Sequence, residues 1–149
     1  MRLSADMLLR VQACLNVAEE REANLRGYQI PAIENLAVLE DQFNCLDLSD
    51  NAIKKIDNFP LMRRVTTLLL HNNQVSRIGS DLGAKLPALQ CLALTSNNVQ
   101  HLYELRALAK LPKLEHLVCM GNPCAMHPHY RLFVVFHLCC LRHQLHGDN

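Results

Sequence analysis

The chain has 149 residues, which is enough for one domain with a sizeable core. Half of the residues are hydrophobic, only 5% are aromatic and none is Trp, so the composition indicates a core of aliphatic side chains. The 15 basic and 14 acidic residues give a net charge of +1, which excludes a broad electrostatic surface for nucleic acid or anionic membranes.

Seven cysteines are present, an odd number without a C-x-x-C pair. They favour reduced thiols that pack as small hydrophobic side chains in a reducing compartment. The sequence does not open with the basic and then apolar stretches of a secretion signal, and the apolar run Leu132–Phe136 is too short to span a bilayer. We therefore expect a soluble, intracellular protein.

Residues 1–20 are predicted to form an N-terminal cap built around one helix. Ser4 is a candidate N-cap residue, and the apolar residues after it recur at helical spacing. We expect the helix over residues 5–19, with an apolar stripe made by Met7, Leu8, Val11, Leu15 and Ala18.

Residues 21–122 contain a repeated pattern. The stretch FNCLDLSDNAIKKI, which begins at Phe43, recurs as VTTLLLHNNQVSRI from Val65 and as LQCLALTSNNVQHL from Leu89, and LEHLVCMGNP begins a further copy at Leu114. An earlier, degenerate copy, ANLRGYQIPAI, has Tyr28 where the others have Asn. The pattern L-x-x-L-x-L-x-x-N-x-L at this period is the leucine-rich repeat. Its asparagines are 22, 24 and 25 residues apart: Asn51, Asn73, Asn97 and Asn122.

The repeat predicts the fold class. Each copy forms a short strand followed by a helical or 3₁₀ return, and about five stacked copies build an α/β solenoid with a curved parallel sheet. The chain turns inside the core after each strand, where backbone groups have no access to water. An asparagine amide supplies both a donor and an acceptor there, so we expect a structural role for the four asparagines.

Residues 123–149 are predicted to close the other end as a helical cap. Pro123 and Pro128 interrupt the repeat, and apolar residues then recur at helical spacing. These are Tyr130, Phe133, Val134, Leu138 and Leu141. The whole chain therefore reads as one leucine-rich-repeat domain.

Function is expected on the concave face of the sheet, because side chains that alternate with the buried leucines point outward there. Five strands about 4.8 Å apart make a trough of about 20–25 Å, which matches a docked helix of about 15 residues. Its second half is apolar, and this favours a protein partner over a small substrate. The outward positions are Glu22, Asn24, Arg26, Cys45, Asp47, Ser49, Thr67, Leu69, His71, Cys91, Ala93, Thr95, His116, Val118 and Met120.

Three stretches carry a more specific resemblance. The segments LRGYQIPAIENL, DNFPLMRRVTTLLLHNN and NPCAMHPHYRLFVV resemble the A′ protein family of the spliceosomal U2 small nuclear ribonucleoprotein. The resemblance implies a nuclear adaptor without enzymatic activity or cofactor. It would hold a helix of an RNA-recognition-motif partner, B″, and support that partner's binding to a U2 RNA stem-loop. Partner-facing residues would be Asn24, Arg26, Asp47, Thr67, Leu69, His71, Ala93, Thr95, Val118 and Met120.

Direct RNA contacts are a separate expectation. The basic candidates near the rim and ends are Arg21, Arg26 and Arg142, each of which also fits an ordinary solvated charge. The family usually continues past the cap into a basic region, whereas this sequence ends at Asn149.

Other functions fit less well. His137, Cys139, Cys140 and His143 suggest a zinc site, but adjacent cysteines serve one tetrahedral ion poorly, so we expect no metal. A thiol enzyme is disfavoured because the cysteines and histidines share no recognisable motif, and Cys45, Cys91 and His116 line an open sheet and not a pocket. The main alternative is another intracellular repeat adaptor, of the axonemal dynein light chain or acidic nuclear phosphoprotein type, that uses the same trough for a different protein.

Overall fold

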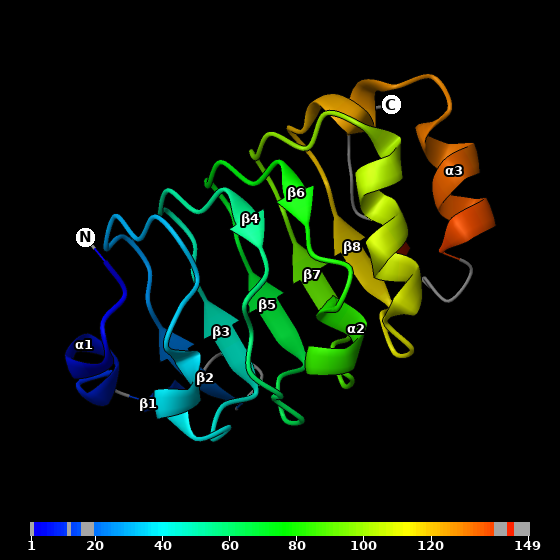
Figure 1. Cartoon of the computed structure of the whole chain (residues 1–149). Helices are drawn as coiled ribbons and strands as arrows, with labels where there is room; N and C mark the ends of the chain where they lie inside the picture. Colours follow the sequence, from blue (N-terminus) through cyan, green and yellow to red (C-terminus); the bar gives the residue numbers. More distant parts are fainter. Residues whose placement is uncertain (1, 12, 16–19, 139–142, 145–149) are drawn as a thin grey trace.

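The computed structural model describes residues 2–11, 13–15, 20–138 and 143–144, and it is a curved solenoid (Figure 1). Seven strands form one sheet in the order β1-β2-β3-β5-β7-β8-β9, and β4 pairs with β6 in a second, two-stranded sheet. The strands of the main sheet are β1 (Ala13–Leu15), β2 (Arg21–Asn24), β3 (Cys45–Asp47), β5 (Thr67–Leu69), β7 (Cys91–Ala93), β8 (His116–Val118) and β9 (His143–Gln144); β4 is Lys55–Ile56 and β6 is Arg77–Ile78.

Short helices lie between the strands and at the two ends. They are α1 (Ala5–Leu9), η1 (Leu36–Leu39), α2 (Leu82–Lys85), η2 (Leu102–Lys110), η3 (Pro123–Met126) and α3 (Tyr130–His137), where η marks a 3₁₀ helix. No helix in the described part of the chain is both long and apolar enough to cross a bilayer. The predicted α/β leucine-rich-repeat solenoid is confirmed.

The register of the sheet explains the core. All strand pairs from β2 to β9 are parallel, and they align Ala23, Leu46, Leu68, Leu92 and Leu117 in one row across the sheet. All five side chains are fully buried. Each repeat therefore adds one aliphatic layer to a continuous core, as stacked repeats require.

The N-terminal prediction is wrong beyond residue 9. Ser4 caps α1 by accepting a hydrogen bond from the backbone N–H of Met7, but the helix ends at Leu9 and β1 follows. β1 pairs antiparallel with β2, so it occupies backbone donors and acceptors that a helix would have left at an open sheet edge. The predicted stripe residues Leu15 and Ala18 lie outside the residues whose side chains are described.

At the C-terminal end, α3 packs onto the last repeats through Tyr130, Val134 and Leu138, which are all buried. Leu141, also predicted on this stripe, lies outside the described residues. After the helix, β9 pairs parallel with β8 and adds a further strand to the sheet. The sequence did not predict β9, because the segment carries no repeat motif.

Candidate functional site

Four asparagines join the turns of successive repeats. The amide nitrogen of Asn73 donates to the carbonyl oxygens of Leu48, Leu70 and His71 at 3.0–3.2 Å, and its oxygen accepts from the N–H of Ile53 at 3.0 Å. Each amide thus bonds its own turn and the turn of the preceding repeat. The same arrangement recurs at Asn51, Asn97 and Asn122.

The degenerate first repeat has a physical explanation. The amide oxygen of Asn51 accepts from the backbone N–H groups of Tyr28 and Ile30, so the second repeat supplies the asparagine bonds for the first. The antiparallel strand β1 lies beside β2, where a preceding repeat would stand, so an asparagine at position 28 would have no earlier repeat turn there to bond. Tyr28 is exposed instead.

The outward residues of the strands line the concave face, but they differ in accessibility. Asp47 and Ala93, in the middle row, are only 8% and 3% exposed, whereas Leu69 and Val118 in the same row are half-buried. Met120 is 42% exposed. Asn24 is exposed, and Thr67, His71 and Thr95 are half-buried.

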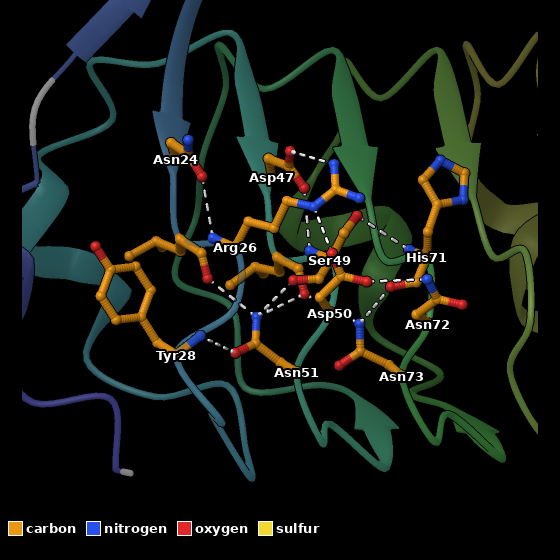
Figure 2. A network of polar contacts seen from close by, with 12 residues as sticks. Asn24, Arg26, Tyr28, Asp47, Ser49, Asp50, Asn51, His71, Asn72 and Asn73 are labelled. Carbon is orange, nitrogen blue, oxygen red and sulfur yellow. Dashed lines mark hydrogen bonds and ion pairs between the residues drawn. The ribbon is translucent and has the colours of Figure 1, made fainter.

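A network of polar contacts links the first three repeats on this face (Figure 2). The Arg26 guanidinium pairs with the Asp50 carboxylate through Nε and lies 4.0 Å from Asp47. Asp50 also accepts from the Asn72 amide at 2.9 Å, and Asp47 accepts from the N–H of Ser49 at 3.0 Å. Three consecutive repeats are linked in this way, and the Arg26 side chain is still half exposed.

Asp50 is central to this network, although the repeat pattern did not predict a role for it. Hydrogen bonds from Asn72 and Arg26 lower the pKa of its carboxyl. The hydrogen bond to Asp50 and the charge of this carboxylate raise the pKa of Arg26. In the structure, the residue before each of these four asparagines has a positive φ: Asp50, Asn72, Ser96 and Gly121. Such positions favour Asp, Asn and Gly, so the residue types at three of the four positions were a signal in the sequence.

Two glutamates add negative charge at the point where the strands begin. Glu22 accepts a hydrogen bond from the Cys45 thiol at 3.2 Å, and Glu20 accepts from the Thr66 hydroxyl at 3.1 Å, across the intervening strand β3. Burial and these carboxylates raise the pKa of Cys45, and burial with Glu20 also raises that of Cys91. Both thiols are therefore held protonated, which makes them poor nucleophiles.

The three arginines proposed for RNA have different surroundings. The Arg21 guanidinium stacks over the Phe43 ring, 5.3 Å from its centroid, and Arg26 belongs to the network described above. Arg142 lies outside the described residues.

Most of the cysteine–histidine cluster considered as a zinc site lies outside the residues whose side chains are described. Cys139 and Cys140 are not described, and neither is the side chain of His143. Among the residues whose side chains are described, no group of three or more His, Cys, Asp or Glu is placed to hold a metal ion.

Comparison with known proteins agrees with this geometry. The leucine-rich-repeat family profile matches residues 1–146. The chain is 43% identical to the probable U2 small nuclear ribonucleoprotein A′ of Caenorhabditis elegans and 45% identical to U2 small nuclear ribonucleoprotein A′ of Arabidopsis thaliana, in each case over 95% of this chain but only 56% and 57% of the relative. It therefore spans little more than half the length of these relatives.

A solved structure covers nearly the whole chain. The crystal structure of the Drosophila melanogaster SNF/U2A′ complex contains a chain that is 40% identical, with a TM-score of 0.94 over 97% of this chain and 83% of that chain. The chain belongs to the leucine-rich-repeat family, and within it is similar to the A′ proteins of the U2 small nuclear ribonucleoprotein.

Proposed function

We propose that this protein is a non-enzymatic adaptor of the U2 small nuclear ribonucleoprotein in pre-mRNA splicing. Its concave sheet binds one helix of an RNA-recognition-motif partner of the B″ type. The pair then binds a stem-loop of U2 RNA, in the nucleus, and this chain supports the partner's choice of RNA.

The observation that carries the proposal is the match to a chain solved in complex with SNF, over a fold that has an accessible concave face. Leu69, Val118 and Met120 remain partly or largely accessible on that face, and they are apolar. Accessible apolar side chains on a curved sheet fit the apolar stripe of an amphipathic helix. Thr67, His71, Ala93 and Thr95 flank them.

The adaptor role also agrees with the chemistry of the face. The thiols of Cys45 and Cys91 are held protonated, and the Arg26 and Asp50 charges pair with each other, so these groups are poorly suited to act as reactive groups. The net charge of +1 gives little affinity for RNA alone. RNA binding is therefore assigned mainly to the partner.

The test is a binding measurement with Drosophila SNF as the probe. We expect the purified chain to form a 1:1 complex with recombinant SNF by isothermal titration calorimetry, and the complex to retain U2 stem-loop RNA in a gel-shift assay in which the chain alone does not. An equal-charge scrambled RNA serves as the control. Failure of the chain to bind SNF at micromolar concentrations would overturn the proposal.

A further inference from the structure

We propose that a basic edge of the solenoid binds phosphate groups of the RNA that the partner carries. This basic edge lies where β5, β7 and β8 begin, and it is made by Arg63, Arg64, Lys85, Lys110 and Lys113. The inference rests on the proposed function and adds to it a direct contact between this chain and the RNA backbone, at residues other than the arginines considered above.

The charge at this edge has one sign. The stretches that lead into β5, β7 and β8 are residues 61–66, 85–90 and 110–115, and they contain five basic residues and one acidic residue, Glu115. Beyond the other ends of the same strands, residues 70–74, 94–98 and 119–123 contain no Lys, Arg, Asp or Glu. Since the whole chain has a net charge of only +1, the excess of positive charge is a local feature of this edge.

Contacts between successive repeats make the three stretches one continuous edge. The backbone N–H of Met62 donates to the carbonyl oxygen of Lys85 at 2.8 Å, and Gly83 packs so closely against the backbone of Lys110 that a side chain would clash there. Lys85 and Lys110 hold equivalent places, each six residues before the start of β7 or β8. These strands are neighbours in the sheet, so we expect the two backbone positions to be about one strand spacing apart, about 4.8 Å.

The lysines carry most of the uncompensated charge. In the described part of the chain, no ion pair includes any of the three lysines; two of them are exposed and Lys85 is half-buried. The two arginines lie closer to acidic groups. Asp41 accepts from their backbone N–H groups at 2.9 and 3.2 Å, and Glu20 accepts from the nearby Thr66 hydroxyl. The positive charge is therefore strongest at the turns that precede β7 and β8.

An RNA backbone fits this edge in charge and in position. Lys meets phosphate as a point charge, and a row of lysines from successive repeats can follow a chain of regularly spaced phosphates. An acidic protein segment has the same sign of charge. The edge, however, borders the concave face on which the RNA-binding partner is proposed to sit, because Lys113 lies only three residues before β8. Phosphate contacts of this kind add affinity without reading bases.

The test compares two sets of charge removals. The edge variant is Lys85→Gln/Lys110→Gln/Lys113→Gln, and Lys85→Arg/Lys110→Arg/Lys113→Arg keeps the charge at the same positions. The control removes three basic charges from exposed residues on and beside the two-stranded β4–β6 sheet: Lys54→Gln/Lys55→Gln/Arg77→Gln.

Each protein is first combined with Drosophila SNF, and calorimetry checks that the complex forms. Binding of fluorescein-labelled U2 stem-loop RNA to the complex is then followed by fluorescence anisotropy from about 50 to about 300 mM NaCl. We expect the edge variant to bind RNA about tenfold more weakly at the lowest salt, and its plot of log K against log [NaCl] to become shallower by about two. The control and the Lys→Arg variant should stay within about twofold of the wild type.

The outcomes separate this inference from the proposed function. If the complex forms but the edge variant has the RNA affinity and salt slope of the control, the edge inference is wrong while the adaptor function stands. The edge inference is also wrong if the edge variant loses binding of poly-glutamate but keeps that of RNA, because the edge would then serve an acidic protein. If the wild type does not bind SNF, the proposed function fails and this inference falls with it.

Misfolding has its own control. Circular dichroism compares the fold of each variant with that of the wild type. If the triple edge variant unfolds, Lys110→Gln and Lys113→Gln, at exposed positions, make the same comparison singly, each with an expected change in salt slope of about one. No change in slope for either single variant would contradict the inference.

Discussion

The inward and outward positions of the same strands differ in how much their residue type varies from repeat to repeat. From β3 to β8, the inward position at the strand centre is Leu in every repeat: Leu46, Leu68, Leu92 and Leu117. The outward position beside it changes every time: Asp47, Leu69, Ala93 and Val118. Stacking imposes one residue type on the core, whereas the outward positions vary from repeat to repeat. Under the proposed function, we expect the accessible outward residues to determine which partner is bound.

The largest expected effect comes from removing one inward leucine. Leu94 is fully buried, so Leu94→Ala should lower the free energy of unfolding by about 2–5 kcal/mol through lost contacts and a cavity. Leu69→Ala makes the same chemical change at a half-buried outward position, and it should cost less than half as much. Urea unfolding followed by circular dichroism measures both. Equal losses of unfolding free energy at the two sites would show that the assignment of inward and outward side chains is wrong.

A smaller loss is expected at the asparagine ladder. Asn73→Ala removes four hydrogen bonds and leaves buried backbone groups without partners, at a cost of about 1–3 kcal/mol. Asn72→Gly is the matched neighbour, because Asn72 is exposed, its side chain donates to Asp50, and Gly accepts the positive φ of this position without strain. We expect it to cost under about 1 kcal/mol. The same urea titration checks this, and an Asn72→Gly loss as large as that of Asn73→Ala would contradict it.

Val118→Asp should separate partner binding from stability. Val118→Asp places a charge on the accessible apolar face, so we expect SNF affinity to fall at least tenfold while the melting temperature changes by less than about 3 °C. Leu69→Asp is a poorer choice, because its neighbour in register is Asp47 and like charges there destabilise the sheet. Val135→Asp, on the exposed side of α3, is the control and should leave SNF affinity unchanged. Isothermal titration calorimetry with SNF and thermal unfolding of the wild type, Val118→Asp and Val135→Asp check this prediction.

The smallest effect concerns pH. Hydrogen bonds from Asn72 and Arg26 lower the pKa of Asp50 in the folded protein, so its carboxylate stabilises the fold above the unfolded pKa of about 3.9. That contribution is lost as the pH falls through the lower, folded value. The stability difference between the wild type and Asp50→Asn should therefore be present at pH 7 and disappear in strong acid. A difference that grows as the pH falls would reverse the assigned sign.

The array was predictable because its determinants are local: each repeat carries its own leucines and asparagine within about 24 residues. At the ends, the capping helices were predictable from the Ser4 N-cap and from the apolar spacing after Pro128. The strands β1 and β9 were not, because they gain their strand geometry from pairing with β2 and β8 and not from a motif of their own. On the concave face, the sequence predicted which residues point outward but not the ion pair between Arg26 and Asp50. That contact joins side chains 24 residues apart, so only the stacking brings them together.

The asparagine ladder has a consequence for how the molecule comes apart. Because each rung spans two turns, opening one repeat breaks bonds that belong to its neighbour as well. Interior repeats therefore cannot melt singly, and loss of structure must start at a terminus and travel inward or occur in a single cooperative transition. Hydrogen exchange should accordingly be slowest for the amides of Ile53, Val75 and Val99, which donate to the ladder oxygens.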